Sequence, residues 1–223
     1  MPFKKIRKAF AVAGVATLAF VGAHAASAAT FDFVSIADNA GDANYIGGTE
    51  LNWGDTAFAA GLTIDGITLI ASGSNVNNNF ADAFFDKGTA GLGVCSTVLG
   101  CATGGPGNTA DDNVSASQGG ETLTLDFGTE VSITDIFFRA AGHGALTGSL
   151  NLNGGVLGIT NGFATSGLSL LSGASVYDFK YTNSEFYISS AVVSAVPIPA
   201  AGLMLLTALG GLTAVRRRKQ KAA

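Results

Sequence analysis

Hydrophobic and polar residues alternate in short runs through the middle of the chain. In the clearest run, 122–127, three apolar residues (Leu123, Leu125 and Phe127) alternate with polar ones, as in a strand with one buried face. Glycine, asparagine, serine and threonine separate the runs. Strands are predicted over residues 30–36, 62–70, 122–127, 131–139, 150–153, 156–160, 177–181 and 185–193. About nine or ten evenly spaced short strands predict an all-β fold, a single jelly-roll-like β-sandwich over residues 29–195.

Turn signals connect several of these runs. Asp65 and Gly66 interrupt the run 62–70 and predict a tight turn or a bulge there. Residues 128–130 and 182–184 each lie between two predicted strands, so we expect hairpins at both places. The 31 glycines among 223 residues are about twice the usual share of ~7%, which also indicates many turns.

The first 28 residues have the three parts of a secretory signal peptide. Four basic residues open it: Lys4, Lys5, Arg7 and Lys8. Residues 9–22 are apolar, and residues 26–28 form an A-x-A site after which we expect cleavage. Residues 23–25 are a weaker site, and a retained anchor helix is the alternative interpretation.

The last 28 residues place a proline-containing motif, an apolar segment and a basic cluster in series. Residues 200–215 predict a transmembrane helix about 24 Å long, shorter than a hydrocarbon core of ~30 Å. Within the basic tail 216–223, a stop signal is formed by Arg216, Arg217, Arg218 and Lys219. Because such residues stay on the cytoplasmic side, this order places residues 29–195 outside the inner membrane.

The motif itself is V-P-I-P-A, formed by Val196, Pro197, Ile198, Pro199 and Ala200. The two prolines interrupt a helix and leave the junction extended. Together with the segments that follow, residues 196–223 resemble the VPLPA-type variant of the PEP-CTERM sorting signal of Gram-negative bacteria, with Ile198 at the usual leucine. The resemblance implies cleavage near Pro199 and Ala200 by an exosortase, a membrane-embedded cysteine protease. A plain single-pass anchor is the alternative.

Removing both ends changes the charge of the chain. All 16 acidic residues lie in the predicted ectodomain, but only three of the 12 basic residues do (Lys87, Arg139 and Lys180), which gives a net charge of −13. Such a surface repels nucleic acid and anionic lipid headgroups and attracts divalent cations. Nucleic acid is therefore not an expected partner.

Cys95 and Cys101 are the two cysteines of the chain. In an exported protein they predict a disulfide across a small loop. A catalytic thiol is disfavoured because the second cysteine lies so near. A zinc site is disfavoured because one mature histidine and two cysteines do not readily complete a tetrahedral site.

Five residues carry oxygen ligands that calcium prefers: Asp86, Asp111, Asp112, Asn113 and Glu121. Their spacing is not that of an EF-hand. A solvated acidic loop is the favoured interpretation, and calcium is the alternative. No other cofactor is expected.

Other candidate residues do not form a recognisable catalytic motif. His143 is the histidine that remains after signal cleavage, and the chain has no G-x-S-x-G motif for a nucleophilic serine. Trp53, with Tyr45 nearby in the sequence, is a candidate for stacking on a sugar ring, although a core or lid position is favoured. We therefore expect that the protein is not an enzyme.

These patterns favour an exported structural protein of the cell surface or extracellular matrix, associated with biofilm exopolysaccharide. The expected partners are the Sec translocon, signal peptidase, the exosortase and polysaccharide, with an intermediate held in the inner membrane by its C-terminal helix. The alternative function is a calcium-dependent carbohydrate-binding module.

Overall fold

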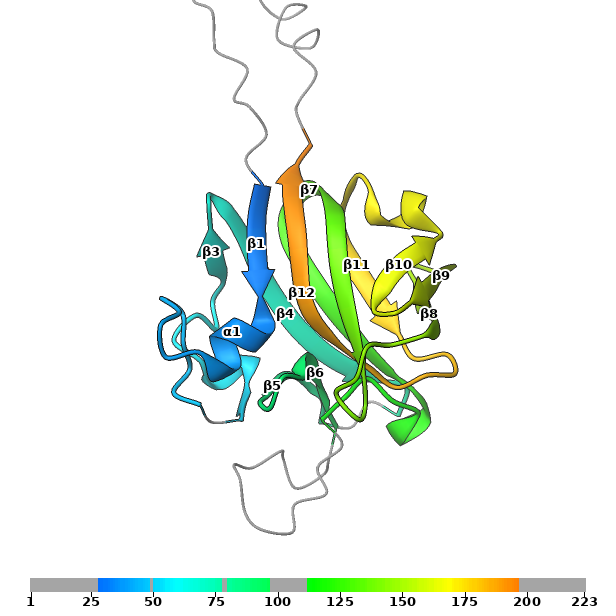
Figure 1. The fold of residues 1–223 in the computed structure, drawn as a ribbon, viewed down its shortest axis with the longest axis horizontal. Coiled ribbons are helices and arrows are strands. Elements are labelled where there is room, and N and C mark those ends of the chain that lie inside the picture. The colour runs from blue at the N-terminus through cyan, green and yellow to red at the C-terminus, as the bar shows by residue number, and fades with distance from the viewer. Residues whose placement is uncertain (1–27, 49, 78–79, 97–111, 197–223) are drawn as a thin grey trace, which may run out of the picture.

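The computed structural model describes residues 28–48, 50–77, 80–96 and 112–196 (Figure 1). Within these ranges the chain is mostly β-strand, which confirms the all-β prediction. The strands are β1 (Ala28–Asp32), β2 (Leu51–Asn52), β3 (Leu62–Ile64), β4 (Ile67–Asn75), β5 (Asp82–Asp86), β6 (Gly91–Cys95), β7 (Glu121–Ala140), β8 (Gly148–Leu152), β9 (Gly155–Thr160), β10 (Phe163–Ser166), β11 (Ala174–Lys180) and β12 (Phe186–Ala195). The helices are α1 (Phe33–Asp38) and three short 3₁₀ helices, η1 (Trp53–Asp55), η2 (Ser117–Gly119) and η3 (Leu168–Leu171). No helix in the described ranges has the length and apolar character to cross a membrane, and residues 200–215 lie outside those ranges.

The 20-residue strand β7 organises the sheet. We expected a hairpin at residues 128–130, and this prediction is wrong because β7 continues through it. The first half of β7 pairs with β4 and β11, and the second half pairs with β12. Both halves bury alternate apolar residues, so a single strand contributes side chains to two parts of the core.

Five strands close into a ring. The hydrogen-bonded order runs β10–β9–β8–β11–β7, and Phe163 of β10 pairs with Phe137 of β7 to complete it. The remaining strands join this barrel at two places: β6, β5, β2 and β1 through β12, and β3 and β4 through the pairing of β4 with β7, so that twelve strands form one connected sheet. The predicted jelly-roll-like sandwich has two separate sheets. The observed topology differs from it, because the long strand β7 belongs both to the barrel and to the strands that extend from it.

Two local predictions also change. The strands around residues 182–184 both exist, but β7 lies between β11 and β12, so they are not a hairpin. The predicted strand 30–36 ends at Asp32, whose Oδ1 accepts a hydrogen bond from Ser35 N at 2.9 Å. This N-cap starts α1 at Phe33. By contrast, Asp65 and Gly66 form the predicted tight turn between β3 and β4, with φ of 48° and 82°.

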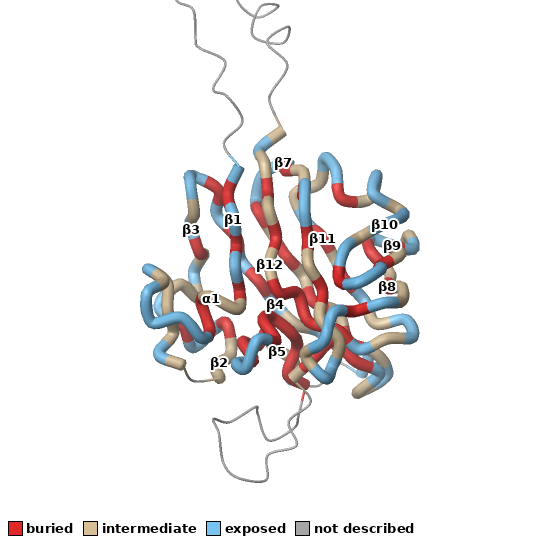
Figure 2. The backbone as a smooth tube through the Cα atoms, in the orientation of Figure 1, coloured by how far each residue is buried: buried red, intermediate tan, exposed pale blue. Residues whose placement is uncertain are grey.

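Buried and more exposed residues alternate along β1, β4 and the first half of β7 (Figure 2). The buried side chains form one main core that includes Phe31, Phe85, Leu125, Phe138 and Tyr177. β1 lies antiparallel beside β12, with Ala28 opposite Ser194. The start of β1 and the end of β12 therefore lie side by side at the same end of the fold (Figure 1).

Candidate functional site

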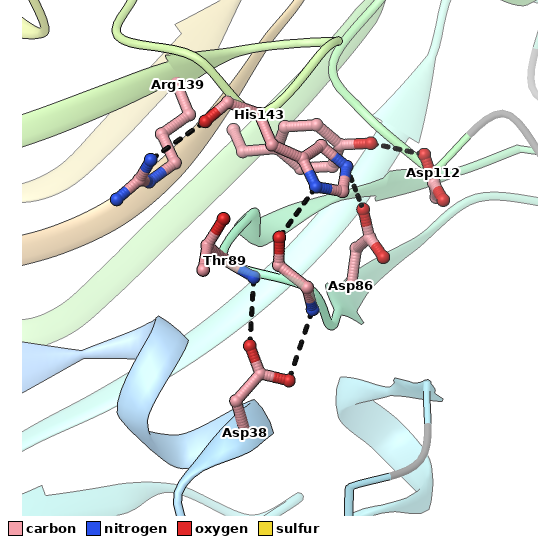
Figure 3. A network of polar contacts seen from close by, with 8 residues as sticks. Asp38, Asp86, Thr89, Asp112, Arg139 and His143 are labelled. Atoms are coloured by element: carbon pink, nitrogen blue, oxygen red, sulfur yellow. Dashed lines mark hydrogen bonds and ion pairs between the residues drawn. The ribbon is translucent and has the colours of Figure 1, made fainter.

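Two places in the described structure gather chemically active side chains. We call the first the His143 cluster; it consists of Asp38, Asp86, Asp112, Arg139, His143 and Tyr187 (Figure 3). Asp86 ends β5, Arg139 lies near the end of β7, and Tyr187 lies on β12. His143 lies in the connection between β7 and β8. The sheet therefore brings together residues that are far apart in the sequence.

Both ring nitrogens of His143 have partners. Nε2 lies 3.1 Å from Asp86 Oδ2, and Nδ1 lies 2.8 Å from the carbonyl oxygen of Gly88. Because a carbonyl only accepts, Nδ1 carries a hydrogen and donates it. The His143 ring also meets the Tyr187 ring edge-on, with centroids 5.6 Å apart. In this arrangement His143 has no nitrogen left to take a proton from a substrate.

The three carboxylates of the cluster differ in burial: Asp86 is buried, Asp112 is half-buried and Asp38 is exposed. Asp86 is 5% exposed, and its pKa is raised to about 6, mainly by burial and in addition by the charge of Asp112. The charge of His143 acts in the opposite direction. The Tyr187 hydroxyl donates to Asp112 Oδ1 at 2.5 Å, and burial followed by this bond raises the pKa of Tyr187.

The outer residues of the cluster join separate segments (Figure 3). Asp38 of α1 accepts hydrogen bonds from Gly88 N at 3.2 Å and Thr89 N at 2.9 Å. Arg139 Nη1 donates to the His143 carbonyl at 2.8 Å. The cluster thereby connects α1, the β5–β6 turn, the β7–β8 connection and β12. We call this arrangement a structural clamp, because its contacts hold these four segments together.

The five predicted calcium ligands do not converge as one set. Asp86 and Asp112 lie close enough that the charge of Asp112 raises the pKa of Asp86, and the Tyr187 hydroxyl donates a hydrogen bond to Asp112. Glu121 lies near the other end of β6, where Ser96 Oγ, Ser115 N and Ser115 Oγ donate to it. Asn113 is buried, and its Oδ1 has no hydrogen-bond partner in the described part of the chain. Asp111 lies outside the described residues. Within those residues no group of three or more histidine, cysteine, aspartate or glutamate side chains could hold a metal ion, and calcium stays the alternative to a solvated acidic loop.

Trp53 belongs to the core. It is 2% exposed, it stacks on Phe85 at 5.7 Å with an interplanar angle of 13°, and it contacts Phe58 edge-on at 5.1 Å. Its faces are therefore covered, and the suggested stacking on a sugar ring is wrong for this arrangement, whereas the core position is confirmed.

Several other predicted residues lie at or beyond the limits of the described chain. Cys95 is buried at the end of β6, and Cys101 lies outside the described residues, so the disulfide stays a prediction. Val196 follows β12 directly. The rest of the sorting motif, Pro197, Ile198, Pro199 and Ala200, and the basic stop, Arg216, Arg217, Arg218 and Lys219, also lie outside.

The second place, which we call the Asp55 cavity, is an open cavity of about 450 Å³ that we did not predict. It lies between the loop that follows α1 and the η1 segment. Its lining residues are Ala43, Asn44, Tyr45, Ile46, Leu51, Asp55, Thr56, Ala57 and Phe58. Tyr45 was noted in the sequence only for its nearness to Trp53. Nothing in the sequence indicates that Tyr45 and Phe58 line one cavity, because the return of the chain after α1 brings them together.

Comparisons with models of known protein families, with curated proteins and with solved structures found no match.

Proposed function

We propose that this chain is an exported surface or matrix protein whose β-rich ectodomain is released from the inner membrane by an exosortase-type cleavage near Pro199 and Ala200. The proposal rests on the signal peptide, the V-P-I-P-A motif, the short apolar segment and the basic stop. No catalytic role is assigned to the ectodomain, because the paired nitrogens of His143 favour a structural clamp.

The structural observation that supports the proposal is the antiparallel pairing of β1 with β12. Ala28 lies opposite Ser194, so the ends of the folded domain are neighbours across a ladder whose Cα atoms are about 5 Å apart. A domain with both ends at one place can be attached to a single membrane by both flanking segments during export.

The borders of the sheet also suit processing at both ends. β12 ends at Ala195, and within the described residues the last backbone bond runs from Val196 N to Glu130 O at 3.2 Å. The exposed Ala28 is the first residue of β1. Cuts after Ala28 and near Pro199 would therefore leave the buried core complete, so the product can keep its fold after release.

The test is intact mass spectrometry of the extracellular protein from a Gram-negative host that carries an exosortase. We expect a C-terminus near residue 199 and an N-terminus near residue 29. Replacing Pro197 and Pro199 together with alanine should keep the full tail and hold the protein in the membrane fraction. Pro106→Ala is the matched control and should be released normally. Extracellular protein that still ends at Ala223 would refute the proposal.

A further inference from the structure

The Asp55 cavity combines aromatic residues with a carboxylate and lacks basic residues. Tyr45 and Phe58 supply rings, and Asp55 supplies the negative charge. None of the lining residues is lysine, arginine or histidine. Its volume of about 450 Å³ lies within the range of ~300–1,000 Å³ that small-molecule sites occupy.

One wall of the cavity is held in place by backbone contacts. Tyr45 N donates to Asp42 O at 3.2 Å, and Ile46 N donates to Ile36 O at 3.0 Å, which ties the loop to α1. The Tyr45 hydroxyl passes so close over Gly48 that a Cβ there would lie 2.6 Å from it. The backbone bonds therefore position the start of the Tyr45 side chain, and the absence of a side chain at Gly48 leaves room for its hydroxyl.

The opposite wall rests on the core. The Phe58 ring stands at 69° to Trp53 and at 81° to Phe85, with centroids 5.1 and 5.9 Å away. Asp55 Oδ2 accepts a hydrogen bond from Asn52 Nδ2 at 2.9 Å, which sets the orientation of the exposed carboxylate. No hydrogen bond to Asp55 Oδ1 is found within the described residues, so that oxygen remains available.

A second carboxylate adds to the negative charge beside η1. Asp82 Oδ2 would lie 3.2 Å from a Cβ at Gly54, the residue before Asp55. Burial raises the pKa of Asp82, and the charge of Asp55 raises it further, against hydrogen bonds from Gly54 and Ala83 that lower it. A cation beside Asp55 would reduce this repulsion, whereas an anion would increase it.

We propose that the Asp55 cavity binds an organic ammonium group, which packs against the Tyr45 and Phe58 rings and pairs with the Asp55 carboxylate. Aromatic rings attract cations through their quadrupole, and a nearby carboxylate adds direct charge pairing. The same chemistry occurs in quaternary ammonium compounds and in sugars with free amino groups. The proposal stands independently of how the chain is exported.

The test uses two matched pairs of ligands, titrated by calorimetry against the full chain in a polyoxyethylene detergent. Choline is compared with 3,3-dimethyl-1-butanol, its uncharged counterpart of the same shape, and a glucosamine oligomer is compared with the N-acetylated oligomer. We expect the charged member of at least one pair to bind with a dissociation constant in the millimolar range, about tenfold more tightly than its neutral counterpart. Added salt should weaken this binding.

Variants locate the binding in the cavity. Asp55→Asn and Tyr45→Ala should each weaken it by about fivefold or more, because one removes the charge and the other a ring. Asp135→Asn, an exposed site on β7 outside the lining residues, is the matched control and should stay within about twofold. Which pair responds identifies the source of the ammonium group.

Three results would overturn the proposal: no binding of either amine, equal binding of the neutral counterparts, or equal loss in the Asp135→Asn control. None of these results bears on the cleavage of the C-terminal tail.

Discussion

Tyr177→Phe tests how the end of the barrel is held together. Tyr177 is 0% exposed, and its ring packs edge-on against Phe127 at 6.1 Å. Its hydroxyl lies 2.7 Å from Val131 O and 3.1 Å from Leu171 O, and it accepts from Ala174 N at 3.3 Å. The hydroxyl therefore joins β7, η3 and β11. The substitution removes it and leaves the packed ring in place.

The expected loss follows from the partners left behind. Val131 O keeps a second donor, Gly173 N at 3.0 Å, so it stays satisfied. Leu171 O and Ala174 N each lose a partner, and an unsatisfied buried group costs ~1–3 kcal/mol. Ser172 and Gly173 are exposed, so water can reach part of this region. We therefore expect the free energy of unfolding to fall by about 2 kcal/mol.

The assay is urea unfolding of residues 28–196, followed by the fluorescence of Trp53, the single tryptophan of the chain. With a slope of about 2 kcal/mol/M, the midpoint should fall by about 1 M, and the slope should not change. Tyr181→Phe is the control, because no hydrogen bond of its hydroxyl is found within the described residues, and its effect should stay within about 0.5 kcal/mol. Equal midpoints for the two variants would refute the role assigned to the Tyr177 hydroxyl.

Three further predictions concern other parts of the fold. The pKa of Asp86 in the folded state is raised from 3.8 to about 6, so its contribution to stability is present below pH ~4 and is lost as the pH rises through ~6. Asp86→Asn should remove up to about 3 kcal/mol of this pH dependence. Unfolding midpoints measured between pH 4 and 7 test this, and parallel profiles for the variant and the unchanged protein would contradict it. Gly91→Ala should destabilise the fold by about 2 kcal/mol or more, because φ of Gly91 is +112° and a Cβ would lie 2.5 Å from Ile188 O. Gly142→Ala, with open space around the added Cβ, is the control and should change the stability by no more than about 0.5 kcal/mol. Equal thermal unfolding midpoints for the two variants would refute this prediction. Millimolar calcium should leave the unfolding midpoint unchanged, because Asp86 and Asp112 already bond to other side chains. A midpoint that rises with calcium and falls again with chelator would instead support a calcium site.

The candidate sites show where prediction from sequence ends. Asp86 and Asp112 were recognised as possible ligands, but their pairing with His143 and Tyr187 was not, because those residues reach the site from β12 and from the β7–β8 connection. The Asp55 cavity was missed for the same reason. Neither wall of the cavity carries a sequence motif that indicates a binding site, and the walls face each other only because the loop returns to α1.

Local sequence patterns are sufficient to predict the all-β class and the turn at Asp65 and Gly66, because alternating burial and left-handed backbone preferences act between near neighbours. Which strands pair depends on tertiary contacts. Residues 128–130 have the composition of a turn, yet β7 runs through them because both of its halves find partners and bury their apolar faces. β7 likewise separates β11 from β12. Strand pairing depends on contacts distant in the chain, and local patterns cannot choose among partners that all offer an apolar face.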